Sequence, residues 1–193
     1  LHSTSRRQRQ MCIRDRFIKE ADDLLGGANV LVNNAGISLH EGTIMDVHYE
    51  QFDKQIETNL KGAYFLSQKF LRMYEKKHRN GGSILFLSSE RGHYADDLPY
   101  GLIKAAINSL TQGLAKMLIH SNIRINAIAP GITTTDMTGI TKDDIYADDY
   151  STGRYYLPEE VAEVACFLVS DASSCLSGQI IICNNGDSIN YRK

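Results

Sequence analysis

The 193-residue sequence lacks the features of membrane, metal-binding and nucleic-acid-binding proteins. Its four cysteines form no C-x-x-C pair and no histidine lies at metal-ligand spacing from them, so we expect free thiols and no metal site. The net charge of −2 gives no electrostatic reason to bind nucleic acid or an anionic membrane. No apolar run approaches the ~20 residues of a membrane span, and no signal-peptide pattern opens the chain. These absences predict a cytoplasmic protein.

Residues 1–16 differ in character from the rest of the chain. They hold five arginines and one acid, and they show no helical or strand periodicity. One interpretation is a basic arm that binds an anionic partner. The interpretation we favour is a non-native or disordered leader, with residues 17–193 forming a single domain.

From Phe17 onward, helical and strand patterns alternate. Apolar residues recur at helical spacing over 17–25, 45–77, 98–119 and 158–169, and short apolar runs at 29–32, 83–88, 123–128 and 179–183 predict buried strands. This alternation predicts an α/β fold, a doubly wound parallel sheet of Rossmann-like type in three α/β/α layers. Ligands bind such sheets at the carboxyl ends of the strands. Residues 132–156 are rich in Thr, Asp and Tyr and are expected to form a mobile insertion that covers the substrate.

Tyr100 and Lys104 are the first residues that could carry chemistry. Residues four apart share a helix face, and an ammonium beside a phenol lowers its pKa, so that the phenol can exchange a proton with an alcohol or carbonyl oxygen. Ser89 ends the strand before this helix and could fold back to hydrogen-bond the same oxygen. Taken alone, the pair Ser88-Ser89 is more typical of a strand-ending turn than of a functional site.

Asn59 is a weak helix former inside a long helical pattern, with Gly62 three residues later. On these residues alone, a surface asparagine or a local kink explains the pattern as well as a function does.

Taken together, the motifs of residues 17–193 resemble the short-chain dehydrogenase/reductase family. Asn33-Asn34-Ala35-Gly36 is similar to the family's N-N-A-G turn, and Asn59 with Gly62 to its N-x-x-G helix motif. Ser89, Tyr100 and Lys104 match its serine and Y-x-x-x-K pattern. Asn126 to Gly131 with Thr135 matches its N-x-x-x-P-G-x-x-x-T segment. These motifs occur in the family's order, which makes the combined resemblance specific although each motif is weak.

The resemblance implies a role for each matching residue. Tyr100 would be the catalytic acid/base, with Lys104 lowering its pKa and holding the nicotinamide ribose of NAD or NADP. Ser89 would orient the substrate oxygen, and Asn59 would anchor a water that links Lys104 to solvent. The adenosine side of the cofactor would be lined by Asn33, Ala35 and Gly36, and the nicotinamide end by Pro130, Gly131, Ile132 and Thr135.

The sequence departs from the family at its start. The family opens with a glycine-rich strand-turn-helix that binds the pyrophosphate, and nothing like it occurs here. The domain is therefore expected to be the C-terminal portion of the fold, lacking the first strands. The strand near residue 30 should then form an exposed apolar edge. We expect weak dinucleotide binding and little or no activity from the chain as given. The residue that selects NAD or NADP is also missing.

The function expected from the resemblance is hydride transfer between NAD(P)(H) and a carbonyl or secondary alcohol. A ketone or 3-oxoacyl-thioester reductase competes with a sugar or polyol dehydrogenase. Two kinds of partner are expected, a small-molecule substrate and further copies of the same chain in a homodimer or homotetramer. The alternatives are a non-catalytic oligomerising partner and a truncated gene product without cofactor binding.

Overall fold

The computed structural model describes residues 16–141, 143, 145–148 and 150–189. Within them, four parallel strands form one sheet in the order β1-β2-β3-β4. The strands are β1 (Val30–Asn33), β2 (Gly82–Leu87), β3 (Ile123–Pro130) and β4 (Ile180–Cys183). Each strand is followed by a helical segment before the next, so the predicted α/β fold with a parallel sheet is confirmed.

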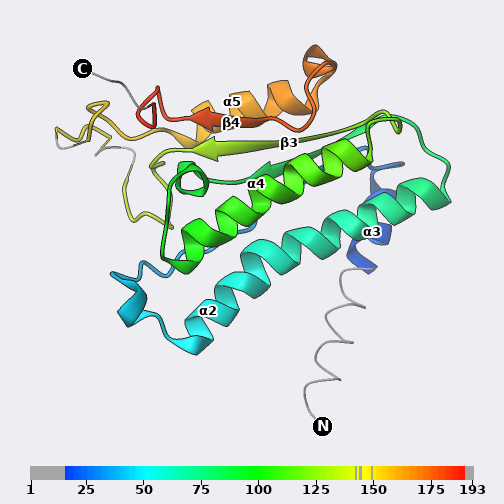
Figure 1. The fold of residues 1–193 in the computed structure, drawn as a ribbon. Helices are drawn as coiled ribbons and strands as arrows, with labels where there is room; N and C mark the ends of the chain where they lie inside the picture. The colour runs from blue at the N-terminus through cyan, green and yellow to red at the C-terminus, as the bar shows by residue number, and fades with distance from the viewer. Residues whose placement is uncertain (1–15, 142, 144, 149, 190–193) are drawn as a thin grey trace, which may run out of the picture.

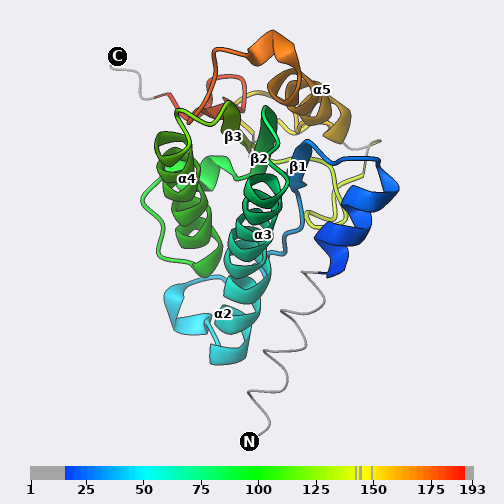
Figure 2. The ribbon, with the colours of Figure 1, turned by 90° about the vertical axis from the view of Figure 1, so that its right-hand side faces the viewer.

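Helices cover both faces of this sheet (Figure 1). One face carries α2 (Tyr49–Gln55), α3 (Ala63–Lys76) and α4 (Pro99–Met117), and the other carries α5 (Pro158–Val169). Figure 2 shows α3 and α4 side by side beneath the strands. The alternation of side chains along β2 explains the layers, because Ile84 and Phe86 pack into the α3–α4 core while Leu85 packs with Leu168 of α5.

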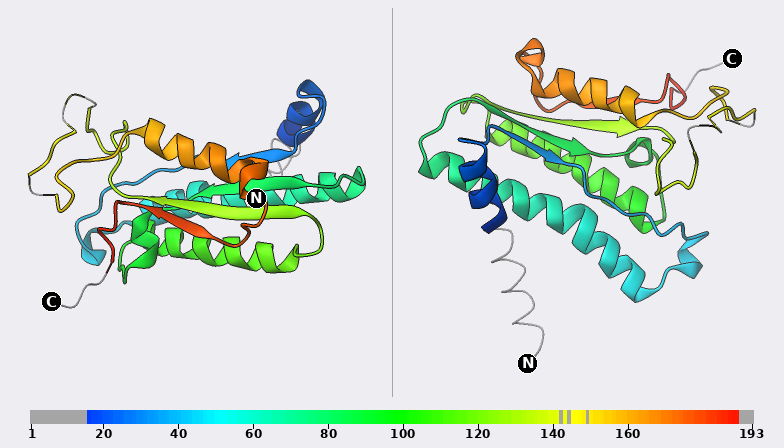
Figure 3. Two further views of the ribbon diagram at one scale, coloured as in Figure 1. Left: turned by 90° about the horizontal axis from the view of Figure 1, so that it is seen from above. Right: turned by 180° about the vertical axis from the view of Figure 1, so that it is seen from behind.

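Residues 16–24 form a further helix beside β1 and the C-terminal end of α3 (Figure 3, right). Ile18 packs into the core, and the buried carboxylate of Asp22 pairs with Lys77 and Arg79. Arg16, which the sequence assigned to the leader, lies in this helix and pairs with Glu20 at 3.3 Å. The rest of the predicted leader, residues 1–15, lies outside the described residues.

The long helix predicted over 45–77 is divided in the structure. A short 3₁₀ turn, Ile44–Asp46, precedes α2, and α2 continues through a π-helical segment, Ile56–Gly62, into α3. The expected helix start at residue 45 was therefore wrong by four residues. The π-helical segment matters for function because such turns occur often at functional sites, and this one carries Asn59.

β1 lies at one edge of the sheet formed by the described residues, and it pairs only with β2 there. Val30 and Val32 on its outer face are 37% and 45% exposed. The predicted exposed apolar edge is thus present in this part of the chain. None of the helices among the described residues combines the length and apolar character needed to cross a membrane.

Candidate active site

A cavity of about 520 Å³ opens at the carboxyl ends of β1, β2 and β3. It brings together eight of the residues predicted from the sequence, which come from four separate segments of the chain. They are Gly36, Ser89, Tyr100, Lys104, Pro130, Gly131, Ile132 and Thr135. The structure therefore places most of the candidate site at the strand ends, as expected.

Tyr100 lies in the first turn of α4, which begins with proline at its first position. Burial raises the pKa of Tyr100 above its ordinary value of 10.0. A hydrogen bond with Ser89 and the positive charge of Arg91 act in the opposite direction. The loop between Ser89 and Tyr100 thus folds back as expected and brings the two hydroxyls together.

Lys104 lies one turn further along α4, with its Nζ 5.3 Å from the centre of the Tyr100 ring. It is only 6% exposed and donates a hydrogen bond of 2.6 Å to the carbonyl of Leu87, at the end of β2. Desolvation lowers the pKa of Lys104 from 10.5 to about 8. The role of Lys104 in lowering the pKa of Tyr100 stays a prediction, and Ser89 and Arg91 act on that pKa in the same direction.

Asn59 projects from the π-helical segment and is 3% exposed. Its Oδ1 accepts a 2.8 Å hydrogen bond from the Ile37 backbone N–H, and its Nδ2 donates a 2.7 Å bond to the Ile37 carbonyl. Asn59 therefore holds the segment that follows β1 against the helix. A Cβ built on Gly36 would lie 3.6 Å from Asn59 Oδ1 and 3.9 Å from Lys104 Nζ, so this backbone passes close to both residues.

Two predicted cofactor residues lie outside the cavity. Asn33 is 8% exposed and its Nδ2 donates a 3.0 Å hydrogen bond to Ser67 Oγ on α3. Its side chain points to the helix layer because the strand alternation places it on the same face as the buried Leu31. Ala35 is exposed and does not line the cavity, whereas Asn34 does. The roles expected for Asn33 and Ala35 on the adenosine side of the cofactor stay predictions, since neither residue lines this cavity.

The first part of the segment expected to cover the substrate, residues 132–140, lies against the cavity. Ile132, Thr133 and Thr135 belong to its wall. A ring nitrogen of His40, from the segment after β1, lies 2.8 Å from the Met137 carbonyl and so connects the two sides. That this segment moves as a lid stays a prediction.

Gly131 allows this segment to approach the sheet closely. A Cβ on Gly131 would lie 2.9 Å from Tyr156 Cε2 and 3.0 Å from Tyr150 Oη. Any larger residue at position 131 would push the two tyrosines away from the end of β3.

Two residues that the sequence did not single out also belong to the cavity wall, Glu90 and Arg91. Glu90 is 8% exposed and its Oε2 accepts a 2.8 Å hydrogen bond from Asn184. Burial raises the pKa of Glu90, an effect opposed by Asn184 and reinforced by Asp187. The feature of the sequence that points to these two residues is the unusual number of charged side chains in the loop between Ser89 and Tyr100.

Among the described residues, the cysteines and the possible metal ligands form no second site. Cys166, Cys175 and Cys183 are free thiols, and Cys12 lies outside the described residues. In the part of the chain that the structure describes, no three His, Cys, Asp or Glu side chains gather as metal ligands.

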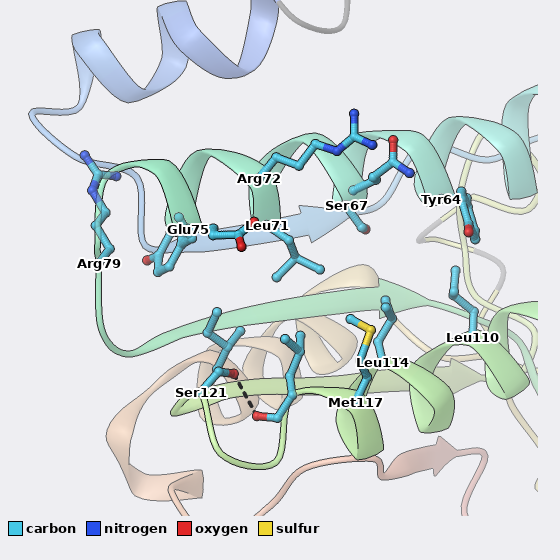
Figure 4. Close-up of a pocket in the computed structure, with 14 residues that line it drawn as sticks. Tyr64, Ser67, Leu71, Arg72, Glu75, Arg79, Leu110, Leu114, Met117 and Ser121 are labelled. Carbon is cyan, nitrogen blue, oxygen red and sulfur yellow. Dashed lines mark hydrogen bonds between the residues drawn. The ribbon is translucent and has the colours of Figure 1, made fainter.

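A second hollow of about 550 Å³ lies between α3 and α4, away from the carboxyl ends of the strands. Leu71 of α3 faces Leu110, Leu114 and Met117 of α4 across it (Figure 4). Tyr64 and Met117 are 46% and 65% exposed, so this is an apolar surface groove with no catalytic group of the cavity in it.

Comparison with known proteins adds an independent line of argument. Residues 13–188 match a family model described as enoyl-(acyl carrier protein) reductase. The chain is 33% identical over 177 residues to a 3-oxoacyl-(acyl-carrier-protein) reductase of Aquifex aeolicus, with 89% of this chain and 70% of that protein covered. It is 32% identical over 180 residues to dehydrogenase/reductase SDR family member 4 of Bos taurus, with 90% of this chain and 64% of that protein covered.

A solved structure from the same family is also similar to this chain. A 3-ketoacyl-(acyl-carrier-protein) reductase of Brucella melitensis, complexed with NADH, superimposes with a TM-score of 0.81 at 28% identity, covering 93% of this chain and 75% of that one. The chain spans 70% of the length of the Aquifex relative and 64% of the bovine one.

Proposed function

The chain belongs to the short-chain dehydrogenase/reductase family, and from that premise we propose that its cavity performs reversible hydride transfer between NAD(P)(H) and a carbonyl or secondary alcohol. Members of the family are oxidoreductases that use nicotinamide dinucleotides. The observation that carries the proposal is the meeting of Ser89, Tyr100 and Lys104 in one cavity at the strand ends.

The cavity fits one end of such a cofactor. Lys104 and Tyr100 offer an ammonium and a phenol suited to ribose hydroxyls, and Gly131 provides a close backbone approach that a side chain would fill. Thr135 and Ile132 complete the wall where the nicotinamide would lie. The bound cofactor would supply the hydride.

The fit is confined to this end. The described residues contain no glycine-rich turn for the pyrophosphate, and β1 is their sheet edge. We therefore propose weak dinucleotide binding by the 193-residue chain.

The chain's own residues divide the remaining tasks. The Ser89 hydroxyl orients the substrate oxygen and stabilises the charge that develops on it. The Tyr100 hydroxyl gives a proton to that oxygen during reduction and takes it back during oxidation. Lys104 is held by the Leu87 carbonyl at the place where it can bind the ribose. Asn59 fixes the segment after β1 beside Lys104, and its part in a water-linked proton relay is a proposal from the resemblance.

Substitution of Tyr100 tests this function. Tyr100→Phe keeps the ring and removes only the hydroxyl, so kcat for NAD(P)H oxidation with a ketone substrate should fall by about 10²- to 10⁴-fold. Tyr49→Phe is the matched control, because Tyr49 lies on α2, 82% exposed and away from the cavity. Equal activity of the two variants would disprove the assignment of Tyr100.

A 3-oxoacyl thioester is the first substrate class we propose, because the Aquifex and Brucella relatives carry that activity in their names. A panel of 3-oxoacyl thioesters, simple ketones and polyols, compared by kcat/KM with both NADH and NADPH, would rank the classes. A polyol preference would favour the sugar dehydrogenase alternative.

Members of this family are typically oligomeric, and we propose a homodimer or homotetramer that uses the α3–α4 groove. Its apolar wall and exposed Tyr64 and Met117 suit a second copy of the same surface (Figure 4). Leu114→Arg should reduce the mass measured by analytical ultracentrifugation to that of a single chain, and an unchanged mass would count against this surface.

The non-catalytic partner is not favoured, because such a protein has no need for an assembled Ser89, Tyr100 and Lys104. A cytoplasmic location remains a prediction.

A further inference from the structure

The loop between Ser89 and Tyr100 holds a charged pair beside the candidate catalytic tyrosine. Arg91 donates from Nε to Asp96 Oδ2 at 2.7 Å and from Nη2 to Asp96 Oδ1 at 2.8 Å. The Arg91 guanidinium carbon lies 5.9 Å from the centre of the Tyr100 ring. That distance is within the ~6 Å range of a cation–π contact.

Asp96 is fixed from two further sides. Its Oδ1 accepts a 2.9 Å hydrogen bond from the Leu98 N–H at the start of α4. Its carboxylate also fills the space beside Gly101, since a Cβ built there would lie 1.9 Å from Asp96 Oδ2. The Asp96 side chain is 8% exposed. The anchor that holds the guanidinium is therefore rigid.

The backbone of Arg91 is fixed as well. Its N–H donates to Ser89 Oγ at 3.3 Å, in a 3₁₀ turn that spans Glu90–His93. The next residue, Gly92, packs on α4, where its carbonyl accepts a 3.1 Å hydrogen bond from Asn108. Because Ser89 Oγ accepts from Arg91, the hydroxyl hydrogen of Ser89 is available for Tyr100 or a substrate oxygen.

We propose that Arg91 is a positioning residue for proton transfer at Tyr100, acting on Ser89 through its backbone and on the phenol ring through its guanidinium. The proposal rests on the proposed function of Tyr100.

Among the charged and titratable groups around the cavity, Arg91 is the one that keeps a positive charge beside Tyr100. Glu90 and Arg91 come from the turn, Asp96 from the loop, Lys104 from α4 and His40 from the segment after β1. The residues of 132–156 and of α5 that line the cavity are uncharged.

Two of these groups carry positive charge close to the ring. Desolvation lowers the pKa of Lys104 to about 8, so it loses its charge before Tyr100, whose pKa burial raises above 10.0, ionises. A guanidinium stays charged throughout, so Arg91 is the lasting cation beside Tyr100.

The test is a titration of one phenol in the full 193-residue chain. Incorporation of 3,5-difluorotyrosine at position 100 places a fluorine reporter there whose phenol is more acidic than that of tyrosine, and ¹⁹F NMR follows its ionisation without cofactor or substrate. Arg91→Gln should move the midpoint to higher pH, so that the phenolate fraction at a fixed pH below the midpoint falls about tenfold. Tenfold corresponds to about 1.4 kcal/mol of difference between the interactions of the guanidinium with the phenolate and with the neutral phenol.

Two variants make the result specific. Lys54→Gln removes the same charge from the exposed side of α2 and should leave the midpoint unchanged. Arg91→Lys keeps the charge without the bidentate geometry and should give a smaller fall, of about threefold. It also carries the test if Arg91→Gln misfolds, since a midpoint equal to that of the parent chain would overturn the positioning role. An unmoved midpoint in Arg91→Gln, or an equal shift in Lys54→Gln, would overturn the proposal.

Failure of the proposed function would look different. In that case Tyr100→Phe would leave hydride transfer intact, whatever the titration shows.

Discussion

Gly101 and Gly113 lie in the same helix, α4, and the structure predicts opposite effects of alanine at the two positions. Alanine in a helix is ordinarily more favourable than glycine by about 0.5–1 kcal/mol. At Gly113 a new Cβ meets nothing within 4 Å, so Gly113→Ala should stabilise the chain by that amount. At Gly101 the Cβ would overlap the Asp96 carboxylate at 1.9 Å.

The cost at Gly101 follows from what Asp96 must give up. Displacing its carboxylate breaks the hydrogen bond to Leu98 N–H, an interaction of helix-cap type that contributes about 1 kcal/mol. It also breaks the ion pair between Asp96 and the partly exposed Arg91, which contributes up to about 1 kcal/mol. Overpacking strain adds about 1 kcal/mol or more. After the alanine gain is subtracted, Gly101→Ala should destabilise the chain by about 1–2 kcal/mol.

Urea unfolding followed by circular dichroism measures both effects. The unfolding free energies of the two variants should differ by about 2 kcal/mol, with the parent chain between them. If Gly101→Ala stabilises the chain as much as Gly113→Ala does, Asp96 does not occupy that space, and the account of how Arg91 is held loses its basis.

Three further predictions concern buried polar groups. Asp22→Asn should cost about 3 kcal/mol in urea unfolding, because two basic partners lose a buried carboxylate. Those partners also depress the pKa of Asp22, so the parent's advantage over this variant should shrink as pH falls below about 3.8. For Lys104 the depressed pKa means that stability should rise with pH between about 8 and 10.5, a rise that Lys104→Met should remove in unfolding midpoints. Asn59→Ala should cost about 1–3 kcal/mol and speed amide hydrogen exchange at Ile37, whereas unchanged exchange would contradict the role given to Asn59.

Much of the architecture could be predicted from the sequence, because the periodicities of strand and helix are local. The four strands lie within two residues of the predicted runs. The π-helical segment at Asn59 could not be predicted in this way, since the apolar residues through it keep the three- and four-residue spacing of an ordinary α-helix.

The site was predictable where it follows strand ends, and less so where it depends on contacts between side chains. The order of motifs placed Ser89, Tyr100 and Lys104 together. The direction of the Asn33 side chain could be predicted, because the alternation from Leu31 puts it on the helix-facing side, and its role toward the cofactor stays a prediction. The charged loop between Ser89 and Tyr100 indicated charged groups near the cavity, but the position of the Arg91 guanidinium over the Tyr100 ring depends on how Asp96 fills the space beside Gly101, which no local pattern records.

The central claim is that this cavity transfers a hydride to a carbonyl carbon, and isotope transfer tests it most directly. The chain would be incubated at millimolar concentrations of NADH or NADPH deuterated at the transferable position, together with a 3-oxoacyl thioester, and the product analysed by mass spectrometry and NMR. The account predicts slow formation of an alcohol with deuterium on its carbinol carbon, lost in Tyr100→Phe. An unlabelled product, or equal labelling in Tyr100→Phe, would contradict it.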